Sequence, residues 1–247
     1  MPSHKVLIVA TSHAELGSSG HRTGVWLEEL ATPYYALLDG GADITLVSIR
    51  GGEIPFDPRS LPAEAGDGPG EEPAERQETP ASVRRFIADA QALQVSRNSP
   101  ALGSVNPAAF DAVFLPGGHG PMWDAATDDT LAQVIGAMFE GGKVVAAVCH
   151  GPAGLVRAQR ADGRSIVEGR QVSAFTNTEE DAVGLTNVVP FLLEDRLKEL
   201  GARFERGPDW QSFSVQDGNL ITGQNPQSSE QVARHVLNAL GRKLPVA

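Results

Sequence analysis

The distribution of apolar residues constrains the fold of this chain more than any other sequence feature, because strand-like and helix-like runs alternate over most of its length. Short apolar runs bounded by turns are typical of buried strands, and apolar residues three or four apart are typical of helices. This alternation predicts an α/β fold with a mostly parallel central sheet and helices on both faces. We expect strands at 5–10, 43–48, 111–115, 143–148 and 171–175, helices at 24–38, 128–139, 189–200 and 231–240, and a hairpin of 213–215 with 220–222 joined through Asp217 and Gly218.

Residues 62–80 depart from this pattern. They are rich in Pro, Gly and Glu and have no apolar periodicity, which predicts an exposed acidic loop inserted in the fold. Thr79 and Pro80 then suit the N-cap and the first position of a helix that runs to Leu93. Since the sequence shows no internal repeat and no further shift in amino-acid composition, we expect one domain over 1–247.

Net charge and cysteine content limit the classes of function. The formal charge is −11, and a basic face for nucleic acid is not expected. Six acids and one Arg lie in 62–80, so about half of that charge is local. One cysteine in 247 residues allows no internal disulfide and fits a reducing compartment. The first apolar run, 5–10, is too short for a signal peptide or a membrane span, so we expect a soluble cytoplasmic protein without membrane partners.

That single cysteine, Cys149, follows the predicted strand 143–148 directly. Open α/β folds carry their chemistry at the carboxyl edge of the sheet, where a strand turns sharply toward a helix. The small residues Gly151 and Gly154 permit such a turn, and a helix N-terminus there would stabilise a thiolate. A buried structural cysteine is the alternative. The position favours an exposed nucleophile.

Two further segments suit the same edge of the sheet. His150 adjoins Cys149, where an imidazole would lower the pKa of the thiol and carry protons. The glycines in Gly117-Gly118-His119-Gly120 follow the strand 111–115, and their backbone N–H groups suit an oxyanion hole. His119 is a candidate for shaping that pocket. Ordinary turn glycines and a surface histidine are the alternatives.

Acidic candidates lie in two places. Glu29 sits among apolar neighbours, four residues before Pro33, which cannot donate to the carbonyl of Glu29 and is expected to kink the helix. A carboxyl group in such surroundings is a candidate for a raised pKa and a general acid/base role. One of Glu179, Glu180 and Asp181 is a candidate to orient His150, the alternative being a solvated acidic loop. We find no metal-ligand spacing, phosphate loop or dinucleotide fingerprint, and therefore expect no metal and no cofactor.

These segments together resemble the PfpI superfamily, whose core is the class I glutamine amidotransferase-like fold. The resemblance extends over nearly the whole chain and is strongest to the branch of Hsp-type chaperones and glyoxalase III (D-lactate dehydratase) enzymes. Two further segments, residues 187–197 and 222–226, add to the resemblance. The segments that carry it are Thr23-Gly24-Val25-Trp26-Leu27-Glu28-Glu29 with Pro33 beyond, Pro116-Gly117-Gly118-His119-Gly120, Ala146-Ala147-Val148-Cys149-His150-Gly151-Pro152 and Phe175-Thr176-Asn177-Thr178-Glu179-Glu180.

The resemblance implies roles for individual residues. It makes Cys149 the nucleophile, His150 its neighbouring base, Glu29 the buried acid that contacts the thiol, and Glu180 the third acid. It also implies an oxyanion hole formed by Gly118 and the amide of His150. The implied reaction is glutathione-independent conversion of methylglyoxal to D-lactate, a lyase activity in stress defence, by a cytoplasmic homodimer without a cofactor.

Other functions use the same constellation. A cysteine peptidase and a deglycase of the same superfamily also need a Cys-His-acid site. A redox-sensing holding chaperone would need only a reversibly oxidised Cys149. Glutamine amidotransfer is less favoured, since no terminal His-x-Glu pair and no synthetase domain are found. The residue pattern by itself leaves the choice between Glu179 and Glu180 open.

Overall fold

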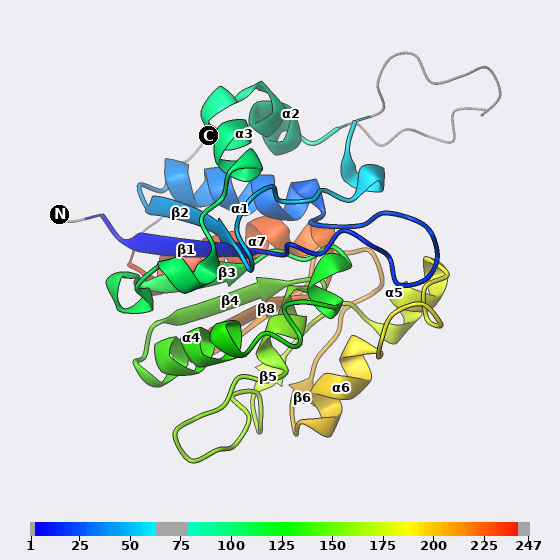
Figure 1. Ribbon diagram of the computed structural model, residues 1–247. Helices are drawn as coiled ribbons and strands as arrows, with labels where there is room; N and C mark the ends of the chain where they lie inside the picture. Colours follow the sequence, from blue (N-terminus) through cyan, green and yellow to red (C-terminus); the bar gives the residue numbers. More distant parts are fainter. Residues whose placement is uncertain (1–2, 63–78, 242–247) are drawn as a thin grey trace.

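The computed structural model describes residues 3–62 and 79–241, and it is built on a six-stranded sheet. The strand order is β2-β1-β3-β4-β8-β7, and every pair is parallel except β7 with β8. This confirms the predicted mostly parallel sheet and the C-terminal hairpin (Figure 1). The strands of this sheet are β1 Lys5–Ala10, β2 Asp43–Ser48, β3 Ala112–Leu115, β4 Val144–Val148, β7 Ser214–Asp217 and β8 Leu220–Gly223.

Helices cover both faces of the sheet, as the alternating pattern predicts. On one face α1 and α7 pack against each other and over the sheet, and α4 packs on the other face (Figure 1). Successive residues of a strand point to opposite faces, so Val6 and Ile8 join one hydrophobic cluster, and Leu7 and Val9 the other. The helices are α1 Leu27–Asp39, α2 Ala81–Ala88, α3 Ala90–Arg97, α4 Asp129–Glu140, α5 Asn177–Ala182, α6 Leu193–Glu199 and α7 Ser229–Ala239.

The structure corrects several predicted boundaries. The strand expected at 171–175 is only β5 Gln171–Val172, and it pairs with β6 Arg203–Phe204 in a separate two-stranded sheet. Helix α1 begins three residues later than expected, because the amides of Val25 and Trp26 donate to carbonyls of distant segments. Helix α6 covers only part of residues 189–200, over which one helix is expected.

The helix expected from Thr79 to Leu93 is two helices. Pro80, not Thr79, is the N-cap of α2, and no side chain caps it. The break falls at Asp89, whose carboxylate accepts from the amides of Gln91 and Ala92 and so caps α3. A residue that competes for backbone amides in this way favours a helix start over a helix interior.

The predicted acidic insertion at 62–80 falls largely outside the residues described, which leave out 63–78. Within residues 3–62 and 79–241, no helix has both the length and the hydropathy needed to cross a bilayer.

Candidate active site

Cys149 begins a sharp turn at the end of β4. Its φ is +59°, a left-handed conformation that costs a non-glycine residue about 1–3 kcal/mol. Two backbone hydrogen bonds hold it: its amide donates to the carbonyl of Gly223, and its carbonyl accepts from the amide of Phe175. The side chain is only 3% exposed. The strained turn therefore places a nucleophile at the carboxyl edge of the sheet.

The segment after Cys149 differs from the predicted helix. Gly151–Leu155 forms a short 3-10 helix, so no α-helix N-terminus lies under the thiol. Glycine is required at 151 because a Cβ there would lie 2.2 Å from the carbonyl oxygen of Leu115. Close packing of the turn against the end of β3 thus takes precedence over regular α-helical geometry.

His150 connects the thiol to a carboxylate. Its Nδ1 lies 3.3 Å from Sγ of Cys149, and its Nε2 lies 2.7 Å from Oε2 of Glu180. All three side chains are buried. Burial alone would raise the pKa of Glu180, but the two histidines on its carboxyl group outweigh burial and hold that pKa well below its ordinary value. Glu180 is therefore an anion that orients the imidazole of His150.

The adjacent Glu179 has a different set of contacts. It belongs to a capping box at the start of α5, in which Oε2 accepts from the amide and hydroxyl of Thr176. Its Oε1 accepts from the amide of Trp210 and from the side chains of Gln224 and Asn225. The carboxylate is fully occupied by donors from three segments, so of the two glutamates only Glu180 reaches His150.

Glu29 approaches the thiol from α1, which continues through Pro33. Its Oε2 accepts from the amide of Gly117 at 2.9 Å, and its carboxyl group interacts with the thiol of Cys149. Its Oε1 has no hydrogen-bond partner among the described residues. Burial is the main cause of a pKa well above the ordinary value, and the charges of Glu28 and Asp57 add to it. Glu29 is therefore a protonated acid beside the nucleophile.

The resting thiol is protonated as well, which corrects the expectation of an exposed, activated thiolate. Burial raises the pKa of Cys149 well above its ordinary value, and the neighbouring Glu29 raises it further. The amide of Gly118 donates to Sγ and opposes this shift. A thiolate at Cys149 would therefore require removal of this proton, and Nδ1 of His150, 3.3 Å from Sγ, is within reach of it.

The glycine loop after β3 supplies the amides that the sequence indicates. Gly117 binds Glu29 and Gly118 binds Cys149, so both amides point into the site. Gly118 has φ +89°, and a Cβ there would lie 2.3 Å from the amide nitrogen of Trp26. A donor at Gly118 beside Sγ suits an oxyanion that forms next to the sulfur.

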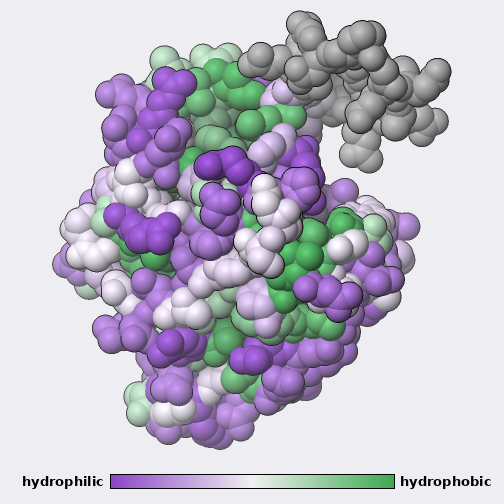
Figure 2. Space-filling model, turned by 45° about the vertical axis from the view of Figure 1, so that its right-hand side comes forward, coloured by the Kyte–Doolittle hydropathy of each residue, from purple (hydrophilic) through white to green (hydrophobic). Residues whose placement is uncertain are grey.

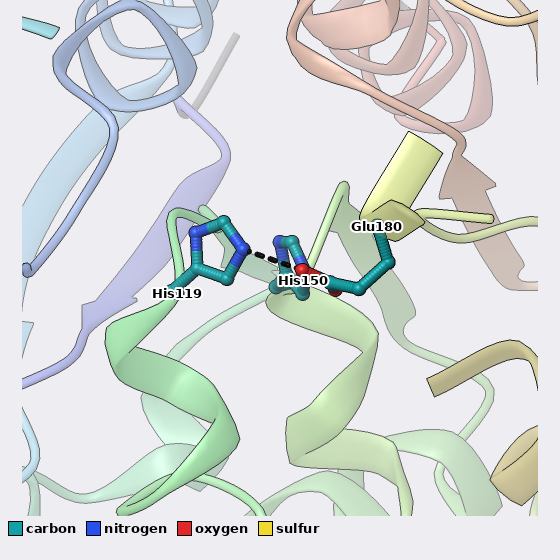
Figure 3. A group of neighbouring side chains, drawn as sticks. All are labelled: His119, His150 and Glu180. Atoms are coloured by element: carbon teal, nitrogen blue, oxygen red, sulfur yellow. Dashed lines mark hydrogen bonds and ion pairs between the residues drawn. The ribbon is translucent and has the colours of Figure 1, made fainter. Parts of the chain in front are cut away.

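His119 lies beside His150, and both imidazoles reach the carboxylate of Glu180 (Figure 3). Its Nε2 is 2.9 Å from Oε1 of Glu180, and its ring centroid is 4.1 Å from that of His150. Burial, together with the charge of His150, lowers the pKa of His119 to about 4. One carboxylate thus holds two imidazoles, one on each oxygen.

His119, His150 and Glu180 also form the group of potential metal ligands nearest to the nucleophile, with ligand atoms within 4.8 Å of one another. Each carboxylate oxygen already pairs with an imidazole nitrogen. Both carboxylate oxygens are therefore engaged in hydrogen bonds to imidazoles. The absence of a metal remains a prediction.

A cavity of about 220 Å³ lies above the thiol. Sequence reasoning missed Arg59 and Trp210 in its wall, since neither lies near a predicted strand end. Trp210 has φ +59° and is held through its amide by Glu179. Figure 2, which turns the right-hand side of Figure 1 forward, shows hydrophobic side chains gathered between polar ones on this face. The lining residues are Trp26, Glu29, Arg59, Gly118, His119, Cys149, His150, Phe175, Val183, Trp210 and Pro226.

Comparison with known proteins assigns this arrangement to a family. Residues 97–239, more than half of the chain, match the DJ-1/PfpI family. The chain belongs to the DJ-1/PfpI family. The match includes Cys149, His150 and Glu180, whereas Glu29 precedes it. The predicted superfamily and fold are therefore confirmed.

Individual DJ-1/PfpI relatives match nearly the whole chain. It is 32% identical over 240 residues to the probable glutathione-independent glyoxalase hsp3103 of Schizosaccharomyces pombe, covering 90% of this chain and 92% of that protein. It is 29% identical to the glutathione-independent glyoxalase HSP31 of Saccharomyces cerevisiae, covering 97% and 99%. Its structure resembles that of glyoxalase III from Candida albicans, with a TM-score of 0.82, 26% identity and coverage of 96% and 97%.

Proposed function

We propose that this chain is a glutathione-independent glyoxalase that converts methylglyoxal and water to D-lactate. The observation that carries the proposal is the position of Cys149 Sγ, 3.3 Å from Nδ1 of His150 and in contact with the protonated Glu29. The named glyoxalases among its relatives support the same reaction. Nucleophile, base and acid are therefore together in one buried site.

The first step is activation and addition. The thiol proton passes to Nδ1 of His150, and Glu180 stabilises the resulting imidazolium. Sγ of Cys149 then bonds to the aldehyde carbon. The aldehyde oxygen, held by the amide of Gly118, takes a proton from Glu29 and becomes the hydroxyl of a hemithioacetal.

The second step is isomerisation. Glu29, now a carboxylate, removes the proton from the former aldehyde carbon and later delivers it to the neighbouring carbon. His150 protonates the ketone oxygen and afterwards takes the proton of the hemithioacetal hydroxyl. An enediol is the intermediate, and the product is a lactoyl thioester on Cys149. Hydrolysis of that thioester restores the thiol and forms lactic acid, whose carboxyl proton returns to Glu29 as lactate leaves.

The size of the site supports a small dicarbonyl substrate. Cys149 is 3% exposed at the base of a cavity of about 220 Å³. A cysteine peptidase has to admit an extended polypeptide to its sulfur, which favours an open cleft. A cytoplasmic homodimer that acts in stress defence, with the chaperone behaviour of that branch, remains part of the proposal and is supported by the sequence resemblance.

The proposal is tested by turnover of methylglyoxal without glutathione. Purified wild type and Cys149→Ala are incubated with methylglyoxal, and D-lactate is measured with a stereospecific dehydrogenase. We expect D-lactate from the wild type and none above background from the variant. Absence of D-lactate from the wild type excludes the glyoxalase, and equal activity of the two proteins excludes Cys149 as the nucleophile.

A further inference from the structure

His119 has one nitrogen that the reaction described above does not use. Its Nε2 pairs with Glu180, but its Nδ1 is buried without a hydrogen-bond partner in the described part of the chain. The side chain is 6% exposed and lies in the wall of the cavity over Cys149. A buried polar atom without a partner loses the free energy of a hydrogen bond unless a ligand supplies one.

The carboxylate decides which nitrogen of His119 carries the proton. Glu180 is ionised, because both histidines lower its pKa, and an ionised carboxylate only accepts hydrogen bonds. The proton of the neutral ring must then lie on Nε2, between His119 and Glu180. Nδ1 is left as an unprotonated acceptor. It therefore suits a hydroxyl group better than an oxyanion, which belongs with the amide of Gly118.

The other acid/base groups of the cavity have different roles. His150 has its Nδ1 at the sulfur and its Nε2 on Glu180, so neither nitrogen is free. Glu29 has a free Oε1, but its raised pKa makes that oxygen a proton donor at rest. The acceptor that remains for a water molecule is Nδ1 of His119.

We propose that His119 is a catalytic residue of the hydrolytic step, whose Nδ1 binds the water that attacks the lactoyl thioester on Cys149. The water oxygen bonds to the thioester carbon as one water proton passes to Nδ1. The bond from that carbon to sulfur then breaks, and the sulfur keeps its electron pair and takes a proton from His150. Glu180 balances the charge of His119 until the proton leaves to solvent. This inference rests on the proposed glyoxalase reaction.

Two substitutions separate the two nitrogens of His119. His119→Gln places an amide N–H close to Nε2, which preserves the donor to Glu180 and removes the acceptor at Nδ1. His119→Asn places an amide oxygen close to Nδ1, which preserves the acceptor and removes the contact with Glu180. If Nδ1 takes the water proton, both variants should hydrolyse the thioester about 10²-fold or more slowly than wild type, because an amide cannot accept that proton. The Asn variant should in addition slow the earlier steps, which depend on Glu180.

The readout is the thioester itself. Each protein is mixed with methylglyoxal, quenched in acid and desalted, so that hemithioacetals revert and thioesters remain. Intact-mass spectrometry should show a lactoyl adduct, removable by hydroxylamine, on His119→Gln and on His119→Asn, and little on wild type. Circular dichroism of both variants reports whether they are folded.

The outcomes separate this inference from the proposed function. If wild type forms D-lactate and His119→Gln hydrolyses the thioester as fast as wild type, His119 does not activate water. If both variants slow equally without an adduct, His119 acts only through Glu180, and the inference is again wrong. If wild type forms no D-lactate, the glyoxalase proposal itself falls, and the hydrolytic role with it.

Discussion

Glu29 contacts the thiol of Cys149 directly, Glu180 reaches it through His150, and both glutamates are almost completely buried. Burial is the main cause of the raised pKa of Glu29, and the charges of Glu28 and Asp57 add to it, so Glu29 holds a proton. Glu180 pairs with two imidazoles, those of His150 and His119, which outweigh its burial, so its pKa is lowered and it is an anion. The difference shows that the surroundings of a buried carboxyl group, rather than its chemistry, decide whether it is a proton donor or a fixed charge.

The largest effect on activity is expected from Glu180→Gln. The amide retains the shape of the side chain but loses the charge that stabilises the imidazolium of His150, and it presents N–H to one of the two histidines. We expect kcat for methylglyoxal to fall by about 10³–10⁴-fold, as for the loss of the acid in other His-acid sites. A rate within tenfold of wild type would show that Glu180 is not the orienting acid.

A somewhat smaller effect is expected from Glu29→Gln. The variant retains an acceptor for the amide of Gly117 but has no transferable proton. We expect kcat to fall by about 10²–10³-fold while iodoacetamide still alkylates Cys149 at a rate close to that of wild type. Loss of alkylation together with turnover would indicate that Glu29 acts on the thiol rather than on the substrate.

The same two variants should change stability in opposite directions. A lowered pKa adds stability above the ordinary carboxyl pKa, about 4.3, and this gain is lost as pH falls below it. A raised pKa costs stability as pH rises through that value. At pH 7 we expect Glu180→Gln to lower the free energy of unfolding by about 1.5–3 kcal/mol and Glu29→Gln to raise it by about 1 kcal/mol.

Urea unfolding at pH 7 and pH 4 measures both differences. The difference between Glu180→Gln and wild type should shrink toward acid, and so should the gain of Glu29→Gln. His119 adds a further dependence of the free energy of unfolding on pH. Its pKa of about 4 lies below the ordinary value of about 6.5, so between these two values the unfolded state takes up the proton and the fold loses stability. If both glutamate substitutions changed the free energy of unfolding in the same direction at pH 7, the contrast drawn between Glu29 and Glu180 would be wrong.

The smallest effect on turnover is expected from Glu179→Gln, which is a matched control for its neighbour. Its amide nitrogen would face donors such as Trp210 and Asn225. We expect the midpoint of unfolding in urea to fall while kcat for methylglyoxal stays within tenfold of wild type. A loss as large as that of Glu180→Gln would show that the two adjacent acids share the role assigned to Glu180.

Local sequence patterns predicted most of the sheet, because strand periodicity depends on residues close together in the chain. The same reasoning placed Cys149 and His150 at the end of a strand, and the structure brings both to the predicted edge. It failed where a distant partner competes with local preference. The amide of Trp26 bonds to Gly117 and shortens α1, and the tight packing of Gly151 against Leu115 converts an expected helix to a 3-10 turn.

By itself the sequence determined the alternating fold, the position of the nucleophile and a short set of candidate acids, since each of these follows from residues that are neighbours in the chain. Only the tertiary structure decided that Glu180 rather than Glu179 meets His150, that Glu29 is protonated, and that Nδ1 of His119 has no hydrogen-bond partner within residues 3–62 and 79–241. The physical reason is that the burial and the electrostatic surroundings of a side chain depend on groups from several segments that are distant in the chain. A local sequence pattern therefore cannot predict them.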